Sequence, residues 1–250
     1  MTDDQRALQA SIRAELGITD HFDAQKEIER RVRFLSDYLL RTGCRSLVLG
    51  ISGGVDSLAA GCLSQRAVEQ AREQGHQAQF IAVRLPYGEQ ADEKDAQGGL
   101  KVINPDQILV VNVKPASDAM LEQLLASGLK FRDAAQQDFL MGNIKARQRM
   151  VAQYAIAGAN GGLVVGTDHA AEALMGFFTK FGDGAADITP LAGLNKRRVR
   201  ALASAMDAFG VSYDQIDDFL EGKAIDDEAT QIIIKTFHAS AHKRALPVAP

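Results

Sequence analysis

Short apolar runs alternate along this chain with longer stretches in which apolar residues recur at helical spacing. Four runs are short and apolar, as in strands buried on both faces of a sheet; they span residues 46–51, 80–85, 107–113 and 162–165. The spacing predicts helices over 1–17, 24–41, 55–75, 91–103, from 115 onward, 137–158, 168–175, 195–206, 213–220 and 227–243. Strands that alternate with helices indicate an α/β fold, a doubly wound parallel sheet flanked by helices. Ligands of such sheets bind beyond the carboxyl ends of the strands.

The length and the composition narrow the class of protein. A chain of 250 residues could form one large α/β domain or two small ones. Because we find no internal repeat and no low-complexity linker, we expect a single domain over 1–250. A 46% share of hydrophobic residues is ample for a core, and a net charge of −4 does not favour a nucleic-acid partner.

The termini and the cysteines suggest a compartment. No apolar run has membrane length, and the amino-terminal MTDDQRALQA is polar and acidic, unlike a signal peptide. Cys44 and Cys62 form no CxxC pair, so we expect two buried, reduced thiols. We therefore expect a cytoplasmic protein with no membrane partner.

A glycine-rich turn follows the first strand, and it carries the most informative residues of the chain; they are Gly50, Ile51, Ser52, Gly53, Gly54, Val55, Asp56 and Ser57. Backbone N–H groups of such a turn, and the positive end of the helix that follows, converge on one spot and bind phosphate. The alternative is an ordinary strand-to-helix loop. No lysine follows the glycines, which excludes the GxxxxGK(S/T) loop of common nucleoside triphosphatases.

This turn resembles the pyrophosphate-binding loop of the ATP pyrophosphatases, which cleave ATP to AMP and pyrophosphate. The resemblance implies that Asp56 holds Mg²⁺ through oxygen ligands, and that Ser52 and Ser57 donate hydroxyl hydrogen bonds to the leaving phosphates. Cleavage between the α and β phosphates implies an adenylated intermediate.

A second group of polar residues follows the fourth strand. Asp168 and Glu172 are four residues apart, and carboxylates at that helical spacing repel unless a cation lies near them. A second contribution to a Mg²⁺ site is the functional interpretation, and a solvated acidic face is the alternative. The segment from Gly176 to Gly184, with its phenylalanines and Lys180, suits a loop that closes over an aromatic, anionic ligand.

Cations gather at the start of one predicted helix. Asn195 is a good N-cap, but Lys196, Arg197 and Arg198 then oppose the helix dipole at about 0.3–1 kcal/mol each when exposed. Either a bound anion reverses this penalty or carboxylates such as those of Asp183 and Asp187 neutralise the cations.

Six blocks now match one family in order: SGGVDS, VRLPYG, GNIKARQRM, GTDHAAEALMGFFTKFGDG, PLAGLNKRR and YDQIDDFLEGK. Over about residues 24–246 the chain resembles the ammonia-dependent NAD⁺ synthetases, whose fold is of the adenine-nucleotide α-hydrolase-like, ATP pyrophosphatase type. No glutaminase-like domain is present, so the resemblance implies a single NAD⁺ synthetase domain that takes free ammonia. The family joins ammonia to nicotinic acid adenine dinucleotide (deamido-NAD) with ATP, giving NAD⁺, AMP and pyrophosphate through an adenylated carboxylate.

The resemblance also implies roles for individual residues. ATP would be bound by the eight residues Gly50 to Ser57 and by Arg84, Thr167 and Lys196, with Arg84 against the adenine. Mg²⁺ would be held by Asp56 and Glu172, which with Lys196 would be the catalytic residues. Deamido-NAD would be bound by Asn143, Arg147, Lys180, Asp187, His242 and Lys243. The family is a homodimer whose dinucleotide site straddles the interface.

The chain departs from the family at one junction. In the family, an acidic segment with a PTADLE-like stretch and an ATP-contacting threonine precedes DAFGVSYDQIDDF, whereas here Met206 is followed directly by Asp207. We expect a loop to be missing from this sequence between these residues, with a natural or engineered deletion as the alternative.

Two other functions stay open. One is another ATP pyrophosphatase, such as a synthetase of the GMP or argininosuccinate type or a tRNA-modifying enzyme. The other is a non-catalytic adenine-nucleotide sensor, against which the intact Asp56 and Glu172 argue.

Overall fold

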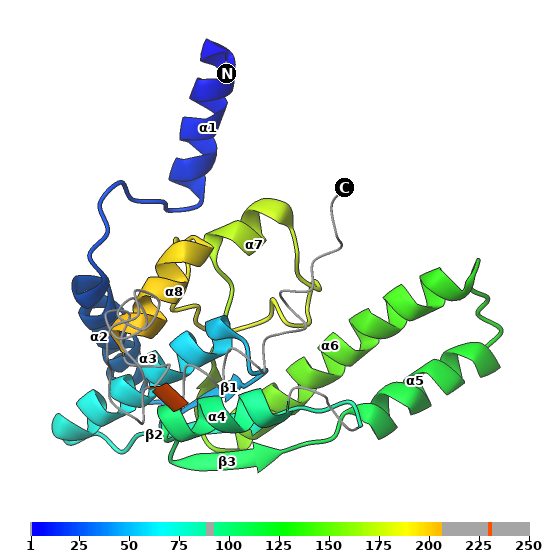
Figure 1. The fold of residues 1–250 in the computed structure, drawn as a ribbon. Helices are drawn as coiled ribbons and strands as arrows, with labels where there is room; N and C mark the ends of the chain where they lie inside the picture. Colours follow the sequence, from blue (N-terminus) through cyan, green and yellow to red (C-terminus); the bar gives the residue numbers. More distant parts are fainter. Residues whose placement is uncertain (1, 89–92, 207–229, 232–250) are drawn as a thin grey trace.

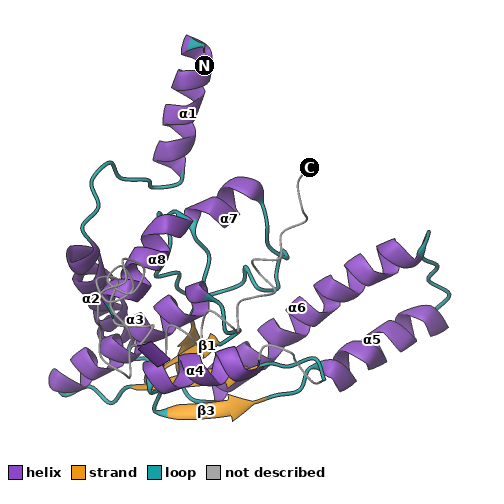
Figure 2. Cartoon of the chain, viewed as in Figure 1, coloured by secondary structure: helices purple, strands orange, loops and turns teal. Residues whose placement is uncertain are grey.

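The computed structural model of this chain describes residues 2–88, 93–206 and 230–231. Its centre is a four-stranded, all-parallel sheet in the order β3-β2-β1-β4. The strands, orange in Figure 2, are β1 (Ser46–Gly50), β2 (Gln79–Arg84), β3 (Gln107–Val110) and β4 (Gly162–Val164). The predicted α/β fold with a doubly wound parallel sheet is confirmed, and so are all four predicted strands.

The helices of the described residues also match the predicted positions; they are α1 (Asp3–Glu15), α2 (Ala24–Thr42), α3 (Val55–Glu73), α4 (Glu93–Ile103), α5 (Lys114–Ala126), α6 (Ala134–Ala159), α7 (Ala170–Met175) and α8 (Lys196–Ala205). The helices predicted over 213–220 and 227–243 lie almost wholly outside the described residues. β3 ends at Val110 rather than at Val113. Val111 and Val113 still donate to the carbonyls of Arg84 and Pro86, but Pro86 has no N–H to return a ladder hydrogen bond.

Alternate residues of the two central strands face opposite layers of helices. On one face Leu47, Leu49 and Phe80 pack with residues of α2, α3 and α8. On the other face Val48, Ile81 and Val83 pack with residues of α6. Because both faces are covered, the strands read as continuous apolar runs. β1 is buried over its first four residues and half-buried only at Gly50, its carboxyl end.

Two features lie away from this core. Helix α1 has no buried residue and stands apart from the sheet (Figure 1). Cys62 is buried and Cys44 only half-buried, so the expectation of two buried thiols is wrong for Cys44; both are free. Burial raises the pKa of the Cys62 thiol to about 11, which keeps it protonated. Among the described residues, no helix is both long enough and apolar enough to cross a membrane.

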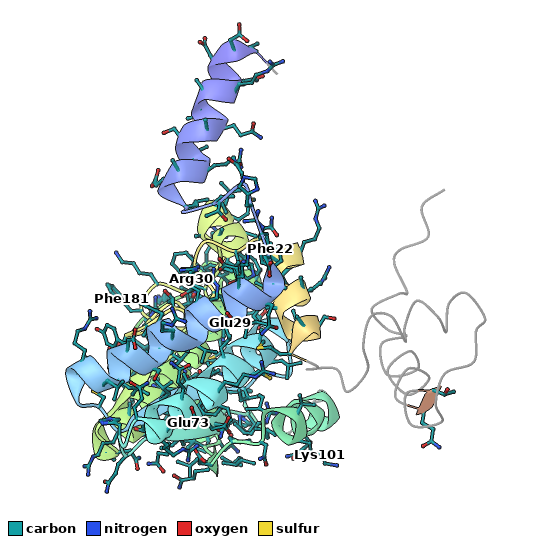
Figure 3. The ribbon with its side chains drawn as sticks, turned by 90° about the vertical axis from the view of Figure 1, so that its left-hand side faces the viewer. Phe22, Glu29, Arg30, Glu73, Lys101 and Phe181 are labelled. Carbon is teal, nitrogen blue, oxygen red and sulfur yellow. The ribbon has the colours of Figure 1, made fainter. Side chains whose placement is uncertain are left out.

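A buried arginine ties α2 to the segment that leads into α8. Arg31 is 5% exposed, and its guanidinium donates hydrogen bonds to the carbonyls of Pro190 and, at 3.1 Å, Ala192. Its Nε lies 2.9 Å from the carboxylate of Glu27. Neighbouring Arg30 reaches the same carboxylate at 2.8 Å but lies on the outer face of α2 seen in Figure 3. Arg31 therefore holds the segment before α8 against α2.

We predict that Arg31→Met lowers the free energy of unfolding by about 2–5 kcal/mol, because two carbonyls and a carboxylate lose a buried donor. Arg30→Met is the matched control and should cost less than about 1 kcal/mol, as exposed ion pairs do. Urea unfolding followed by circular dichroism measures both. Equal losses in the two variants would contradict the role given to Arg31.

Candidate active site

The glycine-rich turn leaves the carboxyl end of β1 and enters α3. Gly53 has φ +87°, a conformation that favours glycine. The Ser57 hydroxyl donates to the Gly54 carbonyl at 3.0 Å and lies 3.2 Å from the Ser52 hydroxyl. These hydroxyls fix the shape of the turn. The first N–H groups of α3 have no partner within the helix and face the turn, so the turn can receive an anion.

Two side chains from other strands and helices hold this turn in place. Gln153 of α6 accepts a hydrogen bond of 2.7 Å from the Gly50 N–H, and a Cβ at Gly50 would lie only 3.1 Å from the same oxygen. Arg84, at the end of β2, is 2% exposed and donates to the Ile51 carbonyl. The structure thus places Arg84 beside the backbone of the turn; its expected place against adenine stays a prediction.

Three side chains converge next to the turn. One ligand atom each of Asp56, His169 and Glu172 lies within 4.8 Å of the others. His169 Nε2 is 3.5 Å from Asp56 Oδ1 and 3.7 Å from Glu172 Oε1. Among the described residues, Asp56 Oδ1 and His169 Nε2 are buried without a hydrogen-bond partner. Two carboxylates with an open oxygen form a donor set that suits a hard divalent cation.

A lysine compensates this negative charge. Lys196 is the first residue of α8, and its Nζ lies 2.5 Å from Asp56 Oδ2. Arg198 instead donates to the Thr19 carbonyl at 2.7 Å. The alternative that carboxylates neutralise these cations holds for Lys196, but the carboxylate is that of Asp56; no ion pair among the described residues joins Asp183 or Asp187 to them. Asp183 accepts from the Thr179 N–H, and Asp187 accepts from the Val164 N–H, both at 2.8 Å.

The predicted pairing of Asp168 with Glu172 on one helix face is also wrong. α7 begins at Ala170 with His169 as its N-cap, so Asp168 lies before the helix. Burial, and then the charges of Glu172 and Asp183, raise the pKa of Asp168 above its ordinary value. Sequence reasoning missed His169, although its place three residues before Glu172 is the spacing of an N-cap acceptor.

The loop after α7 rests on α6. The Thr179 hydroxyl donates to Asn143 Oδ1 at 2.9 Å, and Arg147 donates to the Lys180 carbonyl at 3.2 Å. The structure thereby brings together three residues expected at the dinucleotide. In the same loop Phe177 and Phe181 are 80% and 66% exposed, the latter visible in Figure 3.

The remaining expected residues are less closely grouped. Thr167 follows β4 and is half-buried. Asp187 accepts from the Val164 N–H and, at 3.4 Å, from the Tyr154 hydroxyl, so it ties β4 to α6. His242 and Lys243 lie outside the described residues, as does the residue on the far side of the Met206–Asp207 junction.

Comparisons with known proteins point to one family. A family model described as NAD synthase matches residues 27–208. The NH₃-dependent NAD⁺ synthetase of Streptomyces coelicolor is 56% identical, covering 98% of this chain and 98% of that protein. The protein of the same description from Burkholderia cenocepacia is 55% identical, covering 98% and 95%. Both alignments run over 269 positions, more than the 250 residues here, so these relatives hold residues without a counterpart in this chain.

Solved structures agree. The crystal structure of NAD⁺ synthetase from Burkholderia pseudomallei is 53% identical and superposes with a TM-score of 0.75, over 94% of this chain and 99% of that one. The NMN synthetase of Francisella tularensis is 31% identical with a TM-score of 0.64, over 92% and 99%.

Proposed function

Because this chain belongs to the NAD synthase family, we propose that it is an ammonia-dependent NAD⁺ synthetase that amidates deamido-NAD at the expense of ATP. The observation that carries the proposal is the convergence of Asp56 and Glu172 beside the turn that leaves β1. A phosphate-binding turn alone fits any ATP pyrophosphatase. Identities of 53–56% to NAD⁺ synthetases, against 31% to an NMN synthetase, favour deamido-NAD as the substrate.

ATP would lie with its phosphates at the amino-terminal end of α3. The N–H groups of the first turn and the hydroxyls of Ser52 and Ser57 would bind the β and γ phosphates. Asp56 and Glu172 would hold Mg²⁺, since their hard oxygens fit it and Asp56 Oδ1 has no other partner among the described residues. When bound, Mg²⁺ neutralises phosphate charge and so favours departure of pyrophosphate.

Lys196 has two partners available in this scheme. Without nucleotide it neutralises Asp56 at 2.5 Å. With Mg²⁺ held by Asp56, Lys196 would be able to donate to a phosphate oxygen, and its place at the start of α8 would add a second helix amino terminus near that anion.

The reaction itself needs no protein nucleophile. An oxygen of the nicotinate carboxylate attacks the α phosphorus, a new P–O bond forms, and the bond to pyrophosphate breaks. Ammonia then attacks the acyl carbon, loses a proton, and AMP leaves. The protein contributes position and charge stabilisation. Asn143, Arg147 and Lys180, which the loop contacts bring together, would orient the dinucleotide.

We also propose that the chain acts as a homodimer. α5 and α6 lie side by side and project beyond the edge of the sheet (Figure 1). Large exposed apolar side chains follow this pair and the loop after α7; they include Met120, Leu125, Phe139, Val151, Phe177 and Phe181. Apolar exposure on this scale is typical of an interaction surface. The expected interface buries more than about 2,000 Å² in total, the range of obligate pairs.

The reaction predicts a product balance. With Mg²⁺, ATP, deamido-NAD and ammonium, NAD⁺, AMP and pyrophosphate should form in equal amounts, because the adenylated carboxylate is cleaved once per amide made. Anion-exchange chromatography of the nucleotides measures this. Release of ADP and phosphate would overturn the α–β cleavage, and better turnover of the mononucleotide acid would favour NMN synthesis.

We predict that Asp56→Asn lowers turnover by at least about 100-fold, the loss typical of removing one charge-stabilising group. The amide keeps the size of the carboxylate but not its charge. The exposed Asp37→Asn is the matched control and should retain full turnover in the same steady-state assay. Near-normal turnover of Asp56→Asn would remove Asp56 from the mechanism.

The dimer predicts that Val151→Asp, on α6, yields monomers at micromolar concentration and loses activity, since a buried unpaired charge opposes association. Leu8→Asp, on the separate helix α1, places the same charge at an exposed apolar position and should leave the dimer intact. Light scattering gives the mass of each. A monomeric and fully active parent protein would refute the proposal.

A further inference from the structure

His169 is the one member of the three-residue cluster to which the proposed reaction gives no role. The side chain is 3% exposed and lies between the two carboxylates. Its backbone, at φ −132° and ψ 165°, is that of an N-cap, and its Nδ1 accepts a hydrogen bond of 3.4 Å from the Glu172 N–H. The His169 ring is therefore fixed by its hydrogen bond to the first turn of α7, the helix that carries Glu172.

This cap decides which ring nitrogen bears the proton. Nδ1 must offer a lone pair to the Glu172 N–H, so in the neutral ring the hydrogen sits on Nε2. Nε2 is then a donor, and it lies 3.5 Å from Asp56 Oδ1 and 3.7 Å from Glu172 Oε1. A histidine that ligates a cation through Nε2 would need its hydrogen on Nδ1, where it would meet the Glu172 N–H head-on.

Because His169 is buried, few acceptors lie within reach of its Nε2–H. Among the described residues, His169 Nε2 and Asp56 Oδ1 are both buried without a hydrogen-bond partner, and they lie 3.5 Å apart. Asp56 Oδ2 is occupied by Lys196. Hydrogen bonds of an active site are often long before ligands bind and shorten in the complex.

We propose that His169 is a positioning residue for the Mg²⁺ site of the proposed synthetase. In the ligand-bound site Nε2–H would donate to Asp56, and through its cap the same ring fixes the start of α7 and hence Glu172. One side chain thus sets the orientation of both cation-binding carboxylates, which come from helices far apart in the sequence. Partners that orient metal ligands in this way are worth about 10–100-fold in metal affinity.

Two variants separate the contribution of Nδ1, which caps α7, from that of Nε2, which faces Asp56. In His169→Asn the amide oxygen takes the place of Nδ1 and caps α7, but the side chain is too short to reach Asp56. In His169→Gln the amide N–H₂ reaches the place of Nε2, while the cap is lost. Mn²⁺ affinity in the presence of α,β-methylene ATP, by electron paramagnetic resonance, and thermal unfolding without ligands are measured for each.

We expect His169→Asn to unfold at nearly the parent temperature and to bind Mn²⁺ about 10–100-fold more weakly. His169→Gln should unfold at a lower temperature and recover much of the Mn²⁺ affinity. Parent-like Mn²⁺ affinity in His169→Asn would reduce His169 to a helix cap and overturn the proposal.

Ring ¹⁵N spectra of the parent protein give a second readout. We expect Nε2 to keep its hydrogen when Mg²⁺ and α,β-methylene ATP bind, and loss of that hydrogen would also contradict the proposal. The proposed function fails separately, if the parent protein binds Mn²⁺ and the ATP analogue yet makes no NAD⁺.

Discussion

The arrangement of the site depends on the negative charge of the Asp56 carboxylate, which its neighbours must compensate. It lies in the first turn of α3, only 19% exposed, where an unpaired charge would be costly. Lys196 compensates one oxygen at 2.5 Å, and the other faces His169. Each partner is held by its own contacts. Arg31 binds the segment that leads into α8 and Lys196, and His169 caps α7 through the Glu172 N–H.

The pairing of Asp56 with Lys196 bears on how the proposed site would bind a cation and a nucleotide. Lys196 neutralises Asp56, so this largely buried carboxylate is not left unpaired. In the proposed site a divalent cation would take over Asp56, and Lys196 would then donate to the phosphate chain, whose negative charge one divalent cation only partly neutralises. The amino termini of α3 and α8 favour the same anion. The proposal thus needs only an exchange of partners among Asp56, Lys196 and the bound ligands.

The sequence predicted most of the fold and about half of this site, for physical reasons. Strands buried on both faces are continuous apolar runs, so the sheet could be predicted from the sequence. The glycine-rich turn that carries Asp56 could be predicted too, because its residue types are typical of a phosphate-binding turn. Asp168 was misplaced because the helix begins two residues later than expected, which moves that side chain off the face of Glu172. The bond between Gly50 and Gln153 spans 103 positions, and no local pattern encodes such a contact. For His169 the sequence offered only the spacing of an N-cap. Its proximity to Asp56 arises from tertiary packing, which no local pattern predicts.

The most direct test of this account is a crystal structure with Mn²⁺ and α,β-methylene ATP, with the ion located by its anomalous scattering. We predict an ion bonded to oxygens of both Asp56 and Glu172, with Lys196 Nζ moved from Asp56 Oδ2 to a phosphate oxygen. An intact Lys196–Asp56 pair, with the ion bound elsewhere on the nucleotide, would contradict the claim that Asp56 exchanges its lysine for a cation.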